Sequence, residues 1–290
     1  MQQAIALKTV IFVTLLLPGA LVLNHLYDGQ NETDATSAPL YRQELLRPQV
    51  TPPAGGGYSS CANPEPNAIR RCQEIERQIL ATTVRIEVEA WLKHPVGAEE
   101  FGLYEHRRKQ SLGHGTIKDG RYLVTHNHFD MPLPTPGHPT AWDYGSVRLF
   151  TASGDKLAVL DLNTAFVIVE ERPETLVLDF GTVAGEGFFA AMDLPSARFA
   201  GRKEIALQSG MTVAQVDWEG SRAQVKWIAI AAVVTGQVTP HLVFAASLTQ
   251  GASGGGVFYD GYHVANNWRV IEQYDRSGRL LGQRSMAALN

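Results

Sequence analysis

An alternation of apolar and charged residues between positions 84 and 90 is the clearest hydrophobic pattern of the chain. Its apolar positions are Val84, Ile86, Val88 and Ala90. Because successive side chains of a strand point to opposite faces of a sheet, this alternation predicts a half-buried β-strand. Residues 67–82, just before it, carry apolar side chains three or four positions apart, at Ile69, Cys72, Ile75 and Ile79. That spacing predicts a surface helix with one face packed on the domain.

Short apolar runs separated by turn residues continue to the end of the chain. Asp119 and Gly120 lie between the runs GTI and YLVT, Asp260 and Gly261 lie between two later runs, and residues 275–278 form a third turn signal. Asp-Gly between apolar runs is a strong hairpin signal. Glu99–Gln110 is highly charged and is expected to be a solvated loop. Regularly spaced short strands with turns between them predict an all-β protein.

The first 66 residues differ from the rest of the chain. Thr9–Leu23 is apolar throughout and follows a start whose only basic residue is Lys8. This arrangement predicts an export signal at residues 1–27, either cleaved or kept as a membrane anchor. Residues 28–66 have few apolar side chains and are expected to form a flexible linker. The folded domain is then 67–290, and the protein is expected to be secreted, periplasmic or anchored to the membrane outside the cytoplasm.

Composition and charge narrow the class of protein. The 290 residues are 44% hydrophobic and 19% charged, as in an ordinary globular protein with a sizeable core. The net charge of −4 provides no basic surface, so a nucleic acid is not expected as a partner. Contact with a membrane is expected only through the N-terminal apolar segment.

The two cysteines of the chain, Cys61 and Cys72, lie close together in the sequence. In an exported protein this predicts a disulfide across a short loop, with two buried free thiols as the alternative. Two cysteines alone are too few for a structural zinc site.

Two segments carry candidate chemistry. Thr249–Phe258 reads TQGASGGGVF, with four glycines around Ser253 between positions 251 and 256. Such a turn can present a serine hydroxyl together with backbone N–H groups, as acyl transfer requires, although a surface loop has the same composition. Upstream, the run YLVTHNH ends a predicted strand with His126 and His128.

Together the two segments resemble the trypsin-like serine proteases. GHGTI, the hairpin and YLVTHNH are similar to the GSGTI…YILTAAHC and YILTNNHV segments of that family, and GASGGG resembles its G-D/N-S-G-G motif. The segments occur in the family's order, with His128 and Ser253 separated by 125 positions. The resemblance extends over roughly residues 84–268. It implies a chymotrypsin-like fold of two six-stranded antiparallel β-barrels with a short N-terminal helix.

The resemblance also implies a function and its residues. The expected activity is that of a serine endopeptidase acting on peptides or proteins through an acyl-enzyme, without a metal or organic cofactor. Ser253 would be the nucleophile and His128 the general base. The segment ETLVLDF places Glu174 where the family has its acid, with Asp179 as the alternative. The N–H groups of Gly251 and Ser253 would form the oxyanion hole.

The resemblance further implies a substrate pocket. Ser247 would lie at its floor and Gln250 at its rim, while Trp268 and Arg269 would stand in the segment that pairs with substrate backbone. Ala252 departs from the family, which has Asp or Asn before the nucleophile. Its small side chain cannot hold the oxyanion loop as those residues do.

Two other functions are compatible with the same residues. A protease-like chain without activity could act as a binding module. His126, His128 and Asp130 also resemble the H-x-H-x-D-H core of the metallo-β-lactamase-like zinc hydrolases, although Met131 replaces the final histidine of that core.

Overall fold

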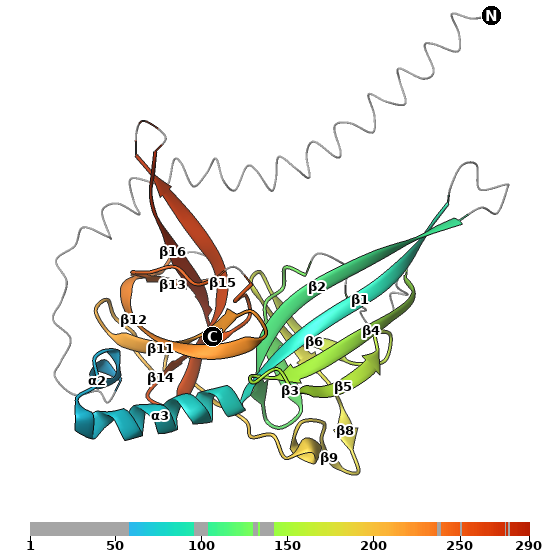
Figure 1. The fold of residues 1–290 in the computed structure, drawn as a ribbon, viewed down its shortest axis with the longest axis horizontal. Helices are drawn as coiled ribbons and strands as arrows, with labels where there is room; N and C mark the ends of the chain where they lie inside the picture. Colours follow the sequence, from blue (N-terminus) through green and yellow to red (C-terminus); the bar gives the residue numbers. More distant parts are fainter. Residues whose placement is uncertain are drawn as a thin grey trace, which may run out of the picture. The chain divides into compact units, whose positions relative to one another are not determined.

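The computed structural model describes the chain from residue 58 onward, with short gaps (Figure 1). The described residues are 58–95, 104–129, 133, 142–236, 239–249, 251–275, 277 and 279–290. The predicted export signal, most of the predicted linker, Asp130 and Gln250 lie outside them. Within the described residues, no helix combines the length and apolarity needed to cross a bilayer.

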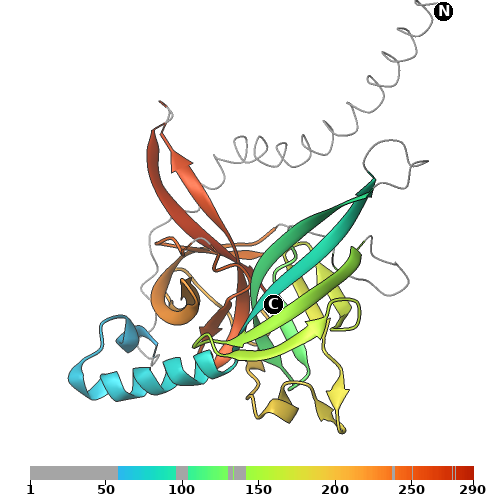
Figure 2. The ribbon, with the colours of Figure 1, turned by 45° about the vertical axis from the view of Figure 1, so that its right-hand side comes forward.

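Within the part of the chain that is described, two helices precede the strands. Helix α2 spans Ser59–Ala62, and α3 spans Pro66–Ala81, close to the predicted 67–82. A disulfide joins the two helices through Cys61 and Cys72, whose Cα atoms are 5.6 Å apart. Figure 1 and Figure 2 both show α3 running below the orange strands of the second sheet.

The packed face of α3 differs in part from the expectation. Ile79 is buried and Ile75 packs against the same cluster, while the indole N–H of Trp227 donates to Glu76 Oε1 at 2.6 Å. Ile69 is 41% exposed, so its predicted burial is wrong. These contacts between α3 and the second sheet come from the C-terminal half of the helix.

The first sheet contains seven antiparallel strands in the order β5-β4-β1-β2-β3-β7-β6. Their bounds are β1 Thr83–Pro95, β2 Tyr104–Lys118, β3 Tyr122–Thr125, β4 Trp142–Thr151, β5 Lys156–Asp161, β6 Val167–Arg172 and β7 Thr175–Asp179. The four apolar side chains of the alternating run 84–90 are each at most 1% exposed and belong to the core of this sheet. The hairpin turn predicted at Asp119 and Gly120 is present, with positive φ values of 53° and 65°.

The charged segment Glu99–Gln110 is not a loop as far as it is described, and this prediction is wrong. Residues 104–110 belong to β2 and pair with residues 89–95 of β1. Arg108 forms two hydrogen bonds of 2.9 Å with Glu89 on the facing strand. The described part of this segment therefore lies on a long hairpin that extends beyond the neighbouring strands in Figure 2. A hairpin of this kind needs no apolar alternation, so the local pattern could not reveal it.

The second sheet also has seven strands, in the order β10-β15-β14-β11-β12-β13-β16. Their bounds are β10 Arg198–Phe199, β11 Thr212–Glu219, β12 Arg222–Val234, β13 His241–Phe244, β14 Gly256–Tyr259, β15 Tyr262–Tyr274 and β16 Leu280–Leu289. An additional pairing of β15 with β16 closes six of them into a barrel. Between the two sheets the chain forms β8 Thr182–Val183, β9 Glu186–Gly187 and the short 3-10 helix η2 Ala190–Met192.

The predicted all-β double-barrel fold is confirmed. The second sheet is a closed six-stranded barrel with β10 added in parallel to β15. The first has seven strands, and among the described residues no pairing joins its outer strands β5 and β6.

Candidate active site

Residues 249–255, which we call the serine loop, form the last part of the connection from β13 to β14, and Gln250 within them lies outside the described residues. Its backbone hydrogen bonds follow a regular pattern. The N–H of Ala252 donates to Thr249 O at 3.2 Å, that of Gly255 to Ala252 O at 3.0 Å, and that of Gly254 to Asn267 O on β15 at 2.8 Å. Within the described part of the chain, the N–H groups of Gly251 and Ser253 take part in none of these backbone bonds. Neither of the two amides that the sequence assigns to an oxyanion hole therefore holds the loop through a backbone bond to the described residues.

Ser253 lies next to His128, from the other sheet. Its Oγ is 3.0 Å from Nε2 of His128 and 3.3 Å from the carbonyl oxygen of Trp268. Both side chains are half-buried. A hydroxyl carries one hydrogen, so it donates to only one of these two acceptors at a time. The structure thus brings the serine and the histidine of the two sequence segments within hydrogen-bond distance.

The turn after β3 fixes the backbone beside His128. Asn127 donates its side-chain amide to the carbonyl of Arg172 at 3.0 Å and also to that of Pro173. His126 is 1% exposed, and its ring stacks on Phe129 with centroids 4.4 Å apart. Burial, and then the charge of His128, lower the pKa of His126 well below its ordinary value. His126 is therefore a neutral side chain packed in the interior.

The zinc hypothesis depends on Asp130, which lies outside the described residues. In the parts of the chain that are described, no group of three His, Cys, Asp or Glu side chains could hold a metal ion.

Both predicted acids have partners other than His128 in the contacts described. Oε1 of Glu174, just before β7, is 3.4 Å from Nε2 of His241. Burial raises the pKa of the Glu174 carboxyl, but hydrogen bonds with His241 and Thr239 and the charges of His241 and Arg269 together lower it by more, so it lies below its ordinary value. Asp179 accepts two hydrogen bonds from Arg121, at 2.6 and 2.5 Å, and these hold its pKa low.

His114 is a site residue that sequence reasoning missed. Its backbone N–H donates to the carbonyl oxygen of Ser253 at 3.2 Å, and its Nδ1 is 3.3 Å from the same oxygen. The ring is 1% exposed and stacks on Trp218 at a centroid distance of 3.9 Å. Burial lowers the pKa of His114 to about 3, although the carbonyls of Ser253 and Gly251 favour the charged form. The only sequence signal was its place inside GHGTI, where the similar family segment has serine.

The residues assigned to the substrate pocket occupy different surroundings. Ser247 is half-buried and donates to the carbonyl of Leu248 at 3.0 Å. The Trp268 ring stacks on His241 at 4.9 Å, and the guanidinium of Arg269 lies 4.3 Å from the centre of the Trp268 ring. His241 therefore connects Trp268 to Glu174. Gln250 lies outside the described residues.

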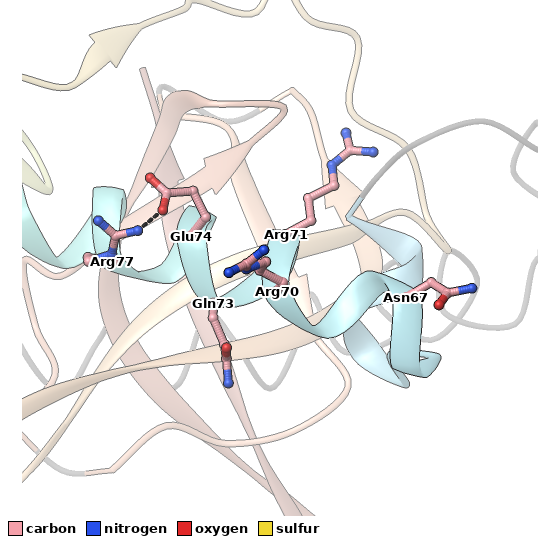
Figure 3. A pocket seen from close by; sticks show the side chains of 6 residues that line it. All are labelled: Asn67, Arg70, Arg71, Gln73, Glu74 and Arg77. Atoms are coloured by element: carbon pink, nitrogen blue, oxygen red, sulfur yellow. Dashed lines mark ion pairs between the residues drawn. The ribbon is translucent and has the colours of Figure 1, made fainter.

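A hollow elsewhere on the surface lies along helix α3. It is lined by Asn67, Arg70, Arg71, Gln73, Glu74 and Arg77. Figure 3 shows that all six side chains project from this one helix and that Glu74 faces Arg77, with which it forms an ion pair. None of these residues is among the predicted site residues.

Comparisons with known proteins bear on the fold. No protein-family model matches the sequence, and no curated protein matches it either. Among solved structures, the chain is similar to a Ser-to-Ala variant of the HtrA-type protease AlgW with a decapeptide, at 16% identity and a TM-score of 0.50. The match covers 74% of this chain and 62% of the AlgW chain, so it spans less than two thirds of that protein.

Two further structures are AlgW with a decapeptide and the Rv3671c protease from M. tuberculosis in its active form. AlgW has 15% identity, a TM-score of 0.47, and coverage of 74% of this chain and 62% of its own. The Rv3671c protease has 12% identity, a TM-score of 0.44, and coverage of 78% and 82%. At such identities the likeness concerns the fold alone. The chain has a divergent trypsin-like protease fold.

Proposed function

We propose that the protein is a serine endopeptidase in which Ser253 attacks the scissile carbonyl and His128 accepts and returns the proton. The observation that carries this proposal is the 3.0 Å distance between Ser253 Oγ and His128 Nε2. A neutral imidazole at this distance can take the hydroxyl proton as the oxygen attacks, which activates an otherwise weak nucleophile. An AlgW variant of similar fold carries a decapeptide, which supports a peptide as the class of substrate.

The oxyanion that forms on attack would be stabilised by the N–H groups of Gly251 and Ser253. They are the amides of the serine loop that the loop's own backbone bonds leave unused, as far as the chain is described. Donors already in place lower the barrier because they need no reorganisation when charge develops.

Glu174 remains the proposed third member of a triad, with Asp179 as the alternative. Its support is local, because Asn127, the residue before His128, holds the carbonyl of Pro173, the residue before Glu174. Oε1 of Glu174 is paired with His241. To serve His128, Asp179 would have to leave Arg121, which holds it with two hydrogen bonds.

A fluorophosphonate probe tests the proposed activity directly, because it reacts with activated serines. We expect the folded wild-type protein to be labelled at Ser253, as identified by mass spectrometry of the modified peptide. Ser253→Ala should abolish the labelling, and His128→Gln should slow it by about 10⁴-fold or more. Ser153→Ala, at an exposed serine on the β4–β5 turn, is the matched control and should react as the wild type does.

The same experiment separates the alternatives. Absence of labelling in well-folded wild-type protein would favour a binding module without activity. Hydrolysis that survives Ser253→Ala but is lost with a chelator would favour the zinc hydrolase.

We also propose that the protein works outside the cytoplasm, exported by residues 1–27. The disulfide between Cys61 and Cys72 supports an oxidising compartment. We expect both thiols to be protected from alkylation in protein taken directly from cells. Free thiols in that sample, measured by mass spectrometry, would contradict the proposed location.

A further inference from the structure

Ala252 lies in the serine loop directly before Ser253. Its side chain is 3% exposed and packs in an apolar cluster with Val216 and Trp218. It has no polar atom that could hold the loop in place. The position of the Gly251 and Ser253 amides therefore depends on groups outside the loop.

Asp217 on β11 supplies such a group. Its Oδ1 accepts the backbone N–H of Thr249 at 3.0 Å, and its Oδ2 accepts the Thr249 hydroxyl at 2.9 Å. Oδ2 also accepts the ammonium group of Lys226. Asp217 is fully buried, and a buried carboxylate is strongly disfavoured unless donors surround it. Charge-assisted hydrogen bonds of this kind are short and directional, so they fix the start of the loop.

A second hydrogen bond links Thr249 to the residue just before Ser253. The carbonyl of Thr249 accepts the N–H of Ala252 at 3.2 Å, which closes the turn just before Ser253. Any shift of Thr249 therefore moves the peptide groups that carry the Gly251 and Ser253 amides.

The end of the loop depends on the same strand. Gly254 donates its N–H to the carbonyl of Asn267, whose side chain is held by the two residues before Asp217. Gln215 donates to Asn267 Oδ1 at 2.6 Å, and Asn267 Nδ2 donates to the carbonyl of Val216 at 2.7 Å. Three consecutive residues of β11 thus support the loop on both sides of Ser253.

We propose that Asp217 is the positioning residue of the serine loop, which it holds through Thr249 so that the Gly251 and Ser253 amides face the reacting carbonyl. It does this in place of a polar side chain at Ala252. This inference rests on the proposed function of Ser253. Asp217 touches no substrate, so its effect is expected on the chemical step and not on peptide binding.

Four variants separate this role from a simple ion pair. Asp217→Ala removes the acceptor. Thr249→Val removes one of the two donors that Thr249 provides without changing its shape, and Asp217→Asn keeps an acceptor for the Thr249 amide. Lys226→Gln removes only the ion pair and is the matched control. The Lys226 side chain is 41% exposed, so water can replace its ammonium group beside Asp217.

The first measurement is the rate constant of fluorophosphonate inactivation. We expect it to fall by about 10²-fold in Asp217→Ala, the effect of losing an oxyanion donor. Smaller losses are expected in Thr249→Val, partial recovery in Asp217→Asn, and less than a twofold change in Lys226→Gln. The affinity of a reversible peptide ligand, measured in a Ser253→Ala background, should be the same in all four.

The second measurement is amide hydrogen exchange over residues 249–255, which needs no activity. Faster exchange of the Thr249 and Ala252 amides in Asp217→Ala and Thr249→Val, with protection unchanged in β12 and β16, supports the proposal. Equal losses of inactivation rate in Lys226→Gln and Asp217→Ala overturn it, as does an unchanged loop in Thr249→Val.

If the wild type is not labelled at all, the proposed function fails, and the exchange measurement alone decides whether Asp217 holds the loop. If Asp217→Ala does not fold, Thr249→Val decides by both measurements.

Discussion

Acidification from pH 7.5 to pH 5 is expected to lower the free energy of unfolding by about 4 kcal/mol. His114 and His263 are almost completely buried, and burial lowers the pKa of each to about 3. In the unfolded chain their pKa is about 6.5, so the unfolded state binds protons that the folded state does not. Since pH 5 lies about 1.5 units below the pKa of the unfolded chain, each histidine lowers the free energy of unfolding by about 2 kcal/mol at this pH. The loss is large beside a total stability of about 5–15 kcal/mol.

The sign and the range follow from the direction of the pKa shifts. The stability due to these histidines is fully present above about pH 6.5 and is lost as the pH falls toward 3. His126, whose pKa is also lowered, acts in the same direction. The lowered pKa values of Glu174 and Asp179 add a further loss, but only near and below the ordinary pKa of a carboxyl. Between pH 7 and 5 the histidines therefore dominate.

Urea unfolding at pH 7.5, 6.0 and 5.0 tests this expectation. Near pH 5 the free energy of unfolding should change by about 1.4 kcal/mol per pH unit for each buried histidine. His114→Gln keeps a donor for the Ser253 carbonyl but cannot titrate, so its slope should be lower by that amount. A slope equal to that of the wild type would show that His114 is protonated in the folded protein.

Gly254→Ala is expected to lower the free energy of unfolding by about 3 kcal/mol and to slow the reaction with a serine probe by about 10²-fold. Gly254 has a φ of +82°, a conformation that costs a residue with a Cβ about 1–2 kcal/mol. A Cβ would also lie too close to the backbone carbonyl of His114 and 2.7 Å from Thr125 Oγ1. Since the His114 carbonyl is backbone, the serine loop itself must move, and Ser253 moves with it.

Gly261→Ala is the matched control for this substitution. Gly261 has a φ of +80° in the β14–β15 turn, with no atom within 4 Å of the position of a Cβ. It should therefore show only the backbone strain and leave the probe reaction unchanged. Equal losses of stability in the two variants would mean that the contact with His114 contributes nothing.

Local sequence patterns predicted the strands and turns whose formation depends mainly on residues near one another in the sequence. The alternation at residues 84–90 gave a buried strand because one face of the first sheet is apolar. The Asp-Gly pairs at residues 119 and 260 gave hairpins because both positions of each turn require a positive φ. The order and spacing of two short motifs led to His128 and Ser253, which lie 3.0 Å apart.

The remaining features depend on contacts between distant segments. His114 and Ser253 are 139 positions apart, and no local pattern indicates that an imidazole will lie beneath the serine loop. Glu174 occupies the expected place in the sequence, but its partner His241 comes from a strand of the other sheet. A match along the chain shows where the backbone of an acid runs, whereas the partner of its side chain depends on the three-dimensional packing.

The carbonyl of Trp268 gives the Ser253 hydroxyl a second acceptor, so the hydrogen bond between Ser253 and His128 can have either polarity. When Nε2 of His128 has no proton, the hydroxyl can donate to it, which is the orientation that nucleophilic attack requires. When Nε2 carries a proton, the imidazole donates to Oγ and the hydroxyl turns its hydrogen to Trp268, so both groups remain bonded. The resting and reactive orientations then differ by the proton on Nε2 of His128 and by a rotation about the Cβ–Oγ bond of Ser253, with no movement of the chain.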